Sequence, residues 1–172
     1  MPARVLVVAF MAAMLSGAAA QEAVQDGPKA RFNDDLITKL EGRWLVTRQI
    51  RGTEVHNLAT AAWVLNHQFL QLHMKDTAEP PAYEAIVLIG FVHASQDYVA
   101  IWTDTFGGRF AAMGRGRRSG NSIEFRFEYP DGPFFNTFTS QPEQPGWTFR
   151  MEAQSPTGDR LPFATDSLAR IR

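Results

Sequence analysis

The stretch Ile123-Glu124-Phe125-Arg126-Phe127-Glu128 alternates an apolar residue with a charged residue over its whole length. Successive side chains of a β-strand point to opposite faces of the sheet, so this pattern places one face in a core and the other in water. Trp147-Thr148-Phe149-Arg150-Met151-Glu152 repeats it. Parallel strands covered by helices are apolar on both faces, so the alternation indicates antiparallel strands.

Outward from these two stretches, the chain from Trp44 to its end consists of short strand-favouring runs separated by turn signals at fairly even spacing. Each turn signal supplies a positive φ or a preset φ. No later stretch has a sustained helical period, so we predict one domain of about nine or ten strands in meander order. The predicted turns are Asn66-His67, Glu79-Pro80-Pro81, Ala94-Ser95-Gln96, Phe106-Gly107-Gly108, Ser119-Gly120, Pro130-Asp131-Gly132-Pro133, Gln144-Pro145-Gly146 and Thr157-Gly158-Asp159.

An antiparallel meander has two edge strands that must be protected from further pairing. Closing the sheet on itself removes both edges. We therefore predict an all-β fold, a single up-and-down β-barrel, with an interior wide enough for side chains and one small ligand. A flattened sandwich of two sheets is the alternative.

A short helix is predicted immediately before the first strand. Asn33 suits an N-cap, and the two aspartates after it place acids in the first turn, where the helix dipole favours them. Gly42 fits the position after the last turn. The apolar face of this helix, spaced i, i+3 and i+4, contains Leu36, Ile37 and Leu40.

The turn at Ser119-Gly120 predicts the register of one hairpin. If these two residues form the loop, Arg115 faces Glu124 as an opposite-charge pair on the outer face. A small residue then lies opposite a large one in two of the inner pairs, as a curved and crowded interior requires. The inner pairs are Gly114 with Phe125, Ala112 with Phe127, and Phe110 with Tyr129.

Composition and charge exclude several classes of function. The 172 residues include 17 Lys+Arg and 18 Asp+Glu, a net charge of -1, which provides no basic surface for nucleic acid. With no Cys there is no disulfide framework, thiolate zinc site or Cys nucleophile. The chain also lacks a G-x-S-x-G elbow and a glycine-rich phosphate loop.

The N-terminus has the order of a secretory signal peptide. One positive charge in Met1 to Arg4 precedes an apolar run from Val5 to Leu15, and Ala18-Ala19-Ala20 supplies the small residues of a cleavage site. The run is too short to span a membrane. We expect cleavage after Ala20 and export to the periplasm or medium, with no stable membrane insertion. The predicted organisation is a signal peptide (1–20), a flexible lead-in (21–32) and a barrel domain (33–172).

Gly42-Arg43-Trp44, which follows a short helix and opens the first strand, resembles the G-x-W motif of the calycin superfamily, which includes the lipocalins. The resemblance implies that Trp44 closes one end of the barrel and that an Arg of the last strand packs across its indole. Arg170 and Arg172 are the two candidates for that Arg. A cation over an indole face is a favourable contact.

Two further stretches resemble a family of exported bacterial calycin-like domains of unknown function. They are the run from Asp97 to Asp104 with the following Phe106-Gly107-Gly108, and Val64 to Leu70. This family is also similar to the haem-binding nitrobindins, whose iron is held by a His near the C-terminus. The last His of this chain is His93, so that ligand has no counterpart here and no cofactor is expected.

Asp104 and His73 are the candidate polar groups. If Tyr98, Trp102 and Asp104 face inward, the carboxylate lies at a barrel mouth, where it suits a base or a polar anchor for a ligand. If Gly107-Gly108 is a two-residue loop, Thr103 pairs with Ala112 and Asp104 points outward. We expect a structural or exposed Asp104, and a surface or hydrogen-bonded His73 in preference to a catalytic base. No His or carboxylate cluster with metal-ligand spacing is present in the sequence.

The aromatic content, 13 Phe, 4 Trp and 3 Tyr, suits either a packed core or a cavity lining for an apolar or aromatic molecule. The leading hypothesis is an exported protein that binds a small hydrophobic molecule inside the barrel without catalysis. The alternatives are a barrel enzyme that uses His73, Asp104 or Tyr98, and an interaction module of the cell envelope. The candidate binding residues are Trp63, His73, Tyr83, Tyr98, Trp102, Asp104, Phe125, Phe127, Trp147 and Phe149.

Overall fold

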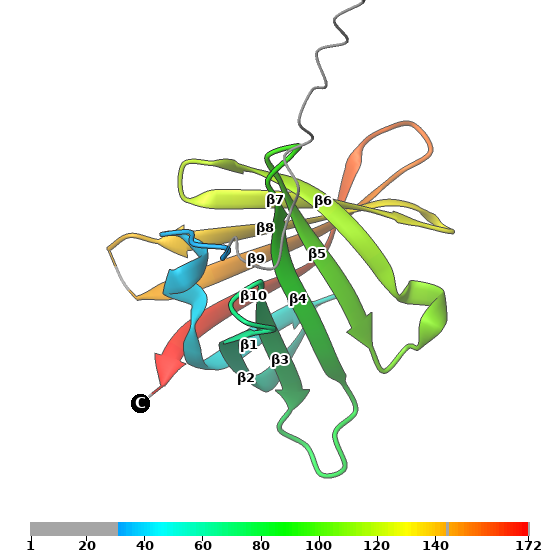
Figure 1. Ribbon diagram of the computed structural model, residues 1–172. Helices are drawn as coiled ribbons and strands as arrows, with labels where there is room; N and C mark the ends of the chain where they lie inside the picture. The colour runs from blue at the N-terminus through cyan, green and yellow to red at the C-terminus, as the bar shows by residue number, and fades with distance from the viewer. Residues whose placement is uncertain (1–30, 144, 172) are drawn as a thin grey trace, which may run out of the picture.

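The computed structural model describes residues 31–143 and 145–171. Ten antiparallel strands form a closed barrel in which neighbours in sequence pair and β1 pairs with β10 (Figure 1). The up-and-down barrel is therefore confirmed. The elements are η1 (Ile37–Leu40), β1 (Gly42–Ile50), β2 (Thr53–Val64), β3 (Phe69–Asp76), β4 (Glu84–Val92), β5 (Asp97–Asp104), η2 (Gly108–Phe110), β6 (Ala112–Ser119), β7 (Ser122–Tyr129), β8 (Gly132–Gln141), β9 (Gly146–Gln154) and β10 (Arg160–Ile171).

Four predictions concern residues outside the described ranges: the signal peptide, the lead-in up to residue 30, Gln144 of the turn predicted at 144–146, and Arg172. No helix within the described ranges is both long and apolar enough to cross a membrane.

The interior is built from alternate residues of every strand. On β7, Ile123, Phe125 and Phe127 are fully buried, while Glu124 and Arg126 are exposed. Burial of one such large apolar side chain stabilises a fold by roughly 1.5–3 kcal/mol. The alternation in the sequence therefore assigned both faces of this strand correctly.

The segment from Phe32 to Leu40 covers the end of the barrel where β1 begins and β10 ends (Figure 1). We call this the capped end. The Tyr98 hydroxyl donates a hydrogen bond to Asp34 Oδ2, which attaches the segment to β5. Four apolar side chains of the segment are at most 3% exposed: Phe32, Leu36, Ile37 and Leu40.

The predicted helix is wrong in type and length, although its apolar face is buried. Only a 3-10 helix forms, Ile37–Leu40. Asp34, and not Asn33, accepts the first free N–H groups, those of Leu36 and Ile37. Short helical pieces commonly adopt the tighter i+3 pattern, and here the next residues must already enter β1.

The predicted register of the β6–β7 hairpin is also wrong, by two residues. Arg117, not Arg115, pairs with Glu124, because the loop consists of Gly120 and Asn121. A shift of two preserves which face each side chain occupies. Gly114 therefore still faces inward. A Cβ on Gly114 would lie only 2.8 Å from the Phe127 ring.

Other turns differ in detail. Gly132 pairs with Tyr129 and belongs to β8, so the predicted turn at 130–133 is shorter than expected. The first hairpin turn, Arg51-Gly52, was not predicted, although both residues have positive φ.

Candidate functional site

The capped end carries the contact that the calycin resemblance implies. The Arg170 guanidinium carbon lies 4.3 Å from the centroid of the Trp44 ring. Its two terminal nitrogens donate to the main-chain oxygens of Glu41 and Lys39, each at 2.8 Å. Trp44 is 1% exposed, and its indole N–H donates to Leu40 O. These bonds hold the 3-10 helix against the barrel.

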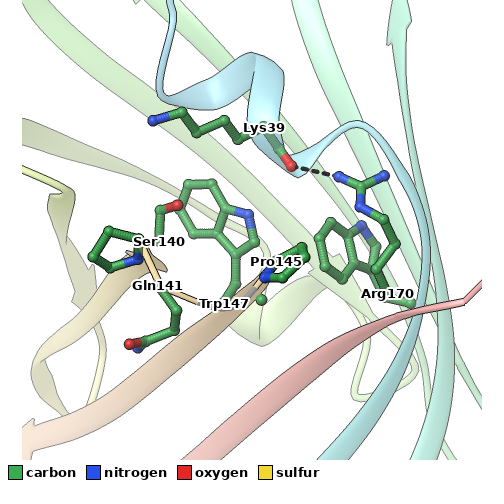
Figure 2. Close-up of a pocket in the computed structure, with 9 residues that line it drawn as sticks. Lys39, Ser140, Gln141, Pro145, Trp147 and Arg170 are labelled. Carbon is green, nitrogen blue, oxygen red and sulfur yellow. Dashed lines mark hydrogen bonds between the residues drawn. The ribbon is translucent and has the colours of Figure 1, made fainter.

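A surface pocket of about 310 Å³ opens beside this contact, between η1 and the β8–β9 connection (Figure 2). Trp44 and Trp147 form its buried part, and Lys39 and Gln141 are at its exposed rim. The guanidinium of Arg170 is already bonded to main-chain carbonyls. The polar side chains left to contact a ligand in this pocket are those of Lys39, Ser140 and Gln141.

The opposite end of the barrel carries a continuous run of aromatic rings. Adjacent ring centroids lie 5.3 to 6.4 Å apart, with the tilted or edge-to-face orientations that aromatic pairs prefer. Five of the rings are half-buried, and Phe106 is 70% exposed. We call this run the aromatic collar; its members in order are Tyr83, Phe106, Phe110, Tyr129, Phe134 and Phe163.

A buried ion pair lies just inside the collar. The Arg48 guanidinium on β1 donates two hydrogen bonds of 2.7 Å to the Asp166 carboxylate on β10. Arg48 is 7% exposed and Asp166 is fully buried. Burial disfavours the charged guanidinium, but the Asp166 carboxylate outweighs this and raises the pKa of Arg48. The Arg48 guanidinium also lies 5.0 Å from the ring of Tyr83, so the pair contacts the collar directly.

Asp104 lies on the same inward face of β5 as the buried Tyr98, Ala100 and Trp102, and it is half-buried. Trp102, not Thr103, pairs with Ala112, so the register that a two-residue Gly107-Gly108 loop would impose, in which Asp104 points outward, does not occur. The chain uses η2 to connect β5 to β6 instead of a two-residue loop. The Asp104 carboxylate accepts hydrogen bonds from Phe106 N at 3.0 Å and from Trp102 Nε1 at 3.3 Å.

Two tyrosines of the collar are affected by this carboxylate. Burial raises the pKa of Tyr129 to about 12, with the negative charge of Asp104 acting in the same direction. Burial also raises the pKa of Tyr83; Arg48 opposes this shift, while Asp104 adds to it. The negative charge of Asp104 therefore acts on both tyrosines at this end of the barrel.

In the part of the chain that the structure describes, one buried side-chain polar atom has no hydrogen-bond partner. Asn136 lies on the inner face of β8, two residues from Phe134, and is 3% exposed. Among the described residues, no donor reaches its Oδ1. Buried side-chain acceptors are nearly always hydrogen-bonded, so this position is unusual.

The structure distributes the ten candidate binding residues over four places. Trp63, Tyr98 and Trp147 lie toward the capped end, and Phe125 and Phe149 lie at mid-barrel. Tyr83, Trp102, Asp104 and Phe127 lie toward the collar.

His73 is on the outer face of β3, with its Nε2 2.6 Å from Glu84 Oε1. Tyr98 and Asp104 are at opposite ends of β5, roughly 20 Å apart along the strand. His73, Tyr98 and Asp104 therefore do not form one site.

Sequence reasoning did not include Arg48 and Asp166 among the candidate residues, nor the collar members Phe106, Phe110, Tyr129, Phe134 and Phe163. One signal was present: Arg48 follows Trp44 and Val46 at intervals of two, so a charge occurs at an inward position. In the described ranges, no group of three or more His, Asp or Glu residues has the arrangement of a metal site.

No protein-family model matches the chain, and no curated protein is significantly similar to it.

Proposed function

We propose that the protein binds a small, largely apolar molecule at the aromatic collar. The observation that carries this proposal is the unbroken run of six rings around the barrel end opposite the capped end. Ligand sites typically combine aromatic walls with a few polar groups that fix orientation. Here Asp104 and the Arg48–Asp166 pair are the polar groups next to the rings.

The collar is a better candidate than mid-barrel for the initial contact with a ligand. Phe125, Phe138 and Phe149 are fully buried and pack against one another at mid-barrel. The collar rings expose part of their surface, so a ligand can cover them without repacking the core. Covering apolar surface stabilises a complex by roughly 25 cal/mol per Å².

A fluorescent apolar probe tests this proposal. N-phenyl-1-naphthylamine should bind saturably, and Phe106→Ala should weaken its binding by about 3- to 10-fold, as the loss of one aromatic contact predicts. Phe106 is 70% exposed, so this change should leave stability unaltered. Met113→Ala is the control, because Met113 is similarly exposed but on the outer face of β6. A probe that never responds, together with no molecule extractable from the purified protein, would refute the proposal.

Export and calycin kinship are part of the same proposal. The signal-like N-terminus supports export, and the contact of Arg170 with Trp44 supports the resemblance. Mass spectrometry of the protein expressed in a Gram-negative host tests export. We expect a chain that begins at Gln21 in the periplasm or the medium, and a cytosolic chain that retains the first twenty residues would contradict it.

A second candidate function, an interaction module, is favoured by one observation. Leu88, Ile101 and Met113 are cross-strand neighbours on the outer face of β4, β5 and β6, and Met113 is 52% exposed. An outward apolar row of this kind suits contact with another protein surface. Self-association that Met113→Glu abolishes, measured by light scattering, would support this role, and a strictly monomeric wild-type protein would count against a second copy as partner.

A further inference from the structure

Some of the charged side chains around the collar have a partner of opposite charge among the described residues, and Asp104 does not. Arg48 is paired with Asp166 at 2.7 Å, and Arg109 is paired with Asp131 at 2.9 Å. Asp104 differs: no Lys, Arg or His nitrogen of the described residues lies within 4.0 Å of its carboxylate. Its two hydrogen-bond donors, an indole N–H and a main-chain N–H, are both neutral.

The unpaired carboxylate lies beside the collar, because it accepts a hydrogen bond from the main-chain N–H of Phe106, whose ring contacts those of Tyr83 and Phe110. Trp102 and Phe106 contact it through their N–H groups, and its charge acts on the hydroxyls of Tyr83 and Tyr129. Aromatic rings around a negative charge are the environment in which proteins hold organic cations, because both the ring faces and the carboxylate attract positive charge. A ligand anion at this place would be repelled by Asp104.

The two other cations that touch the collar do not neutralise Asp104. Arg109 lies 5.4 Å from the Phe110 ring but is paired with Asp131. Arg51 lies 5.5 Å from the Phe163 ring, at the turn between β1 and β2. In the order of strands around the barrel, that turn is remote from β5.

We propose that Asp104, with Phe106 and Tyr129 beside it, forms a head-group subsite of the collar, and that it takes a ligand with a cationic nitrogen, an amine or quaternary ammonium group, attached to an apolar body. This inference rests on the proposed binding function and adds the charge of the ligand. The apolar body lies on the remaining rings of the collar, which continue from Tyr129 through Phe134 to Phe163.

The test compares three probes that share one chain length: octyltrimethylammonium, octanol and octanoate. Binding is measured by calorimetry at low salt, with the intrinsic tryptophan fluorescence of the protein as a second readout. We expect the ammonium probe to bind at least about tenfold more tightly than octanoate, and added salt to reduce this preference. Asp104→Asn should abolish the preference while the affinity for octanol is retained, because the amide oxygen still accepts from Phe106 N.

The control is Asp131→Asn, which removes a carboxylate of the same barrel end that is already paired with Arg109. It should leave the preference for the ammonium probe unchanged. If none of the three probes binds, the proposed function itself fails. If all three bind equally to the wild type, or if a folded Asp104→Asn keeps the preference, the binding function survives and the cation subsite is refuted. Circular dichroism establishes that each variant is folded.

Discussion

The guanidinium of Arg48 and the carboxylate of Asp166 face each other in a bidentate pair inside the barrel, although 118 residues separate them in the chain. They come from β1 and β10, the two strands whose pairing closes the sheet. Their contact therefore exists only in the closed barrel. Because both groups are buried, each neutralises a charge that would otherwise be buried without a partner.

Removing one partner of this pair should destabilise the protein much more than removing both. We expect Arg48→Met or Asp166→Leu alone to lower the free energy of unfolding by about 3–5 kcal/mol, since each leaves a buried charge. The double variant should recover most of this loss. Urea unfolding of the four proteins measures the effect. Single variants that each cost less than about 1 kcal/mol would show that the pair is solvated in solution.

Gly114 should tolerate no side chain. A Cβ there would lie 2.8 Å from the Phe127 ring, which is fully buried and has little room to move. We expect Gly114→Ala to destabilise the protein by about 1–3 kcal/mol, the usual cost of overpacking. Gly108→Ala is the matched control, because nothing lies within 4 Å of a Cβ at that position. Equal unfolding midpoints for the two variants would contradict the tight packing of β6 on β7.

The faces of the strands were predictable from the sequence, but the register was not. Facing depends only on a period of two, which Ile123 to Glu128 displays without any knowledge of partners. Register depends on which residues form the loop. Ser119 and Gly120 were chosen from residue type, whereas Gly120 and Asn121 form the turn, with Gly120 at a φ of 58°. Both loops contain a glycine, so the turn preferences of the residue types do not distinguish one register from the other.

The candidate site was predictable only in part, for a related reason. Tyr83, Trp102 and Asp104 were identified as aromatic or polar residues on apolar strands, and they do meet at one barrel end. Arg48 and Asp166 were not identified, because the role of a charge at an inward position depends on its partner, which here lies on a strand distant in sequence. The pairing of β1 with β10 is a property of barrel closure that no local pattern contains.

The three tyrosines of the chain should lose their protons at a higher pH in the native state than in the unfolded state. Burial, with help from Asp34, raises the pKa of Tyr98 to about 12, and Tyr129 reaches a similar value. Unfolded tyrosines titrate near ~10. Between these values the native state retains protons that the unfolded state has lost, so stability is intact below pH ~10 and falls as the pH rises toward 12.

Ultraviolet absorbance of the phenolate measures this titration directly. The native protein should show little phenolate near pH ~10, where the protein in denaturant is half titrated. Tyr129→Phe should remove one of the late-titrating groups and reduce the alkaline loss of stability. A native titration curve that superimposes on the denatured one would contradict the burial of these rings.

The buried amide of Asn136 should cost the protein stability. Its Oδ1 is buried on the inner face of β8 without a donor among the described residues, so the folded protein carries the cost of that desolvated oxygen. Asn136→Leu, which keeps the volume and removes the polar atoms, should raise the free energy of unfolding by about 1 kcal/mol. Asn136→Ala should not, because it leaves a cavity beside Phe125 and Met151. Urea unfolding compares the three proteins, and a clear loss of stability in Asn136→Leu would mean that this amide has a hydrogen-bond donor in solution.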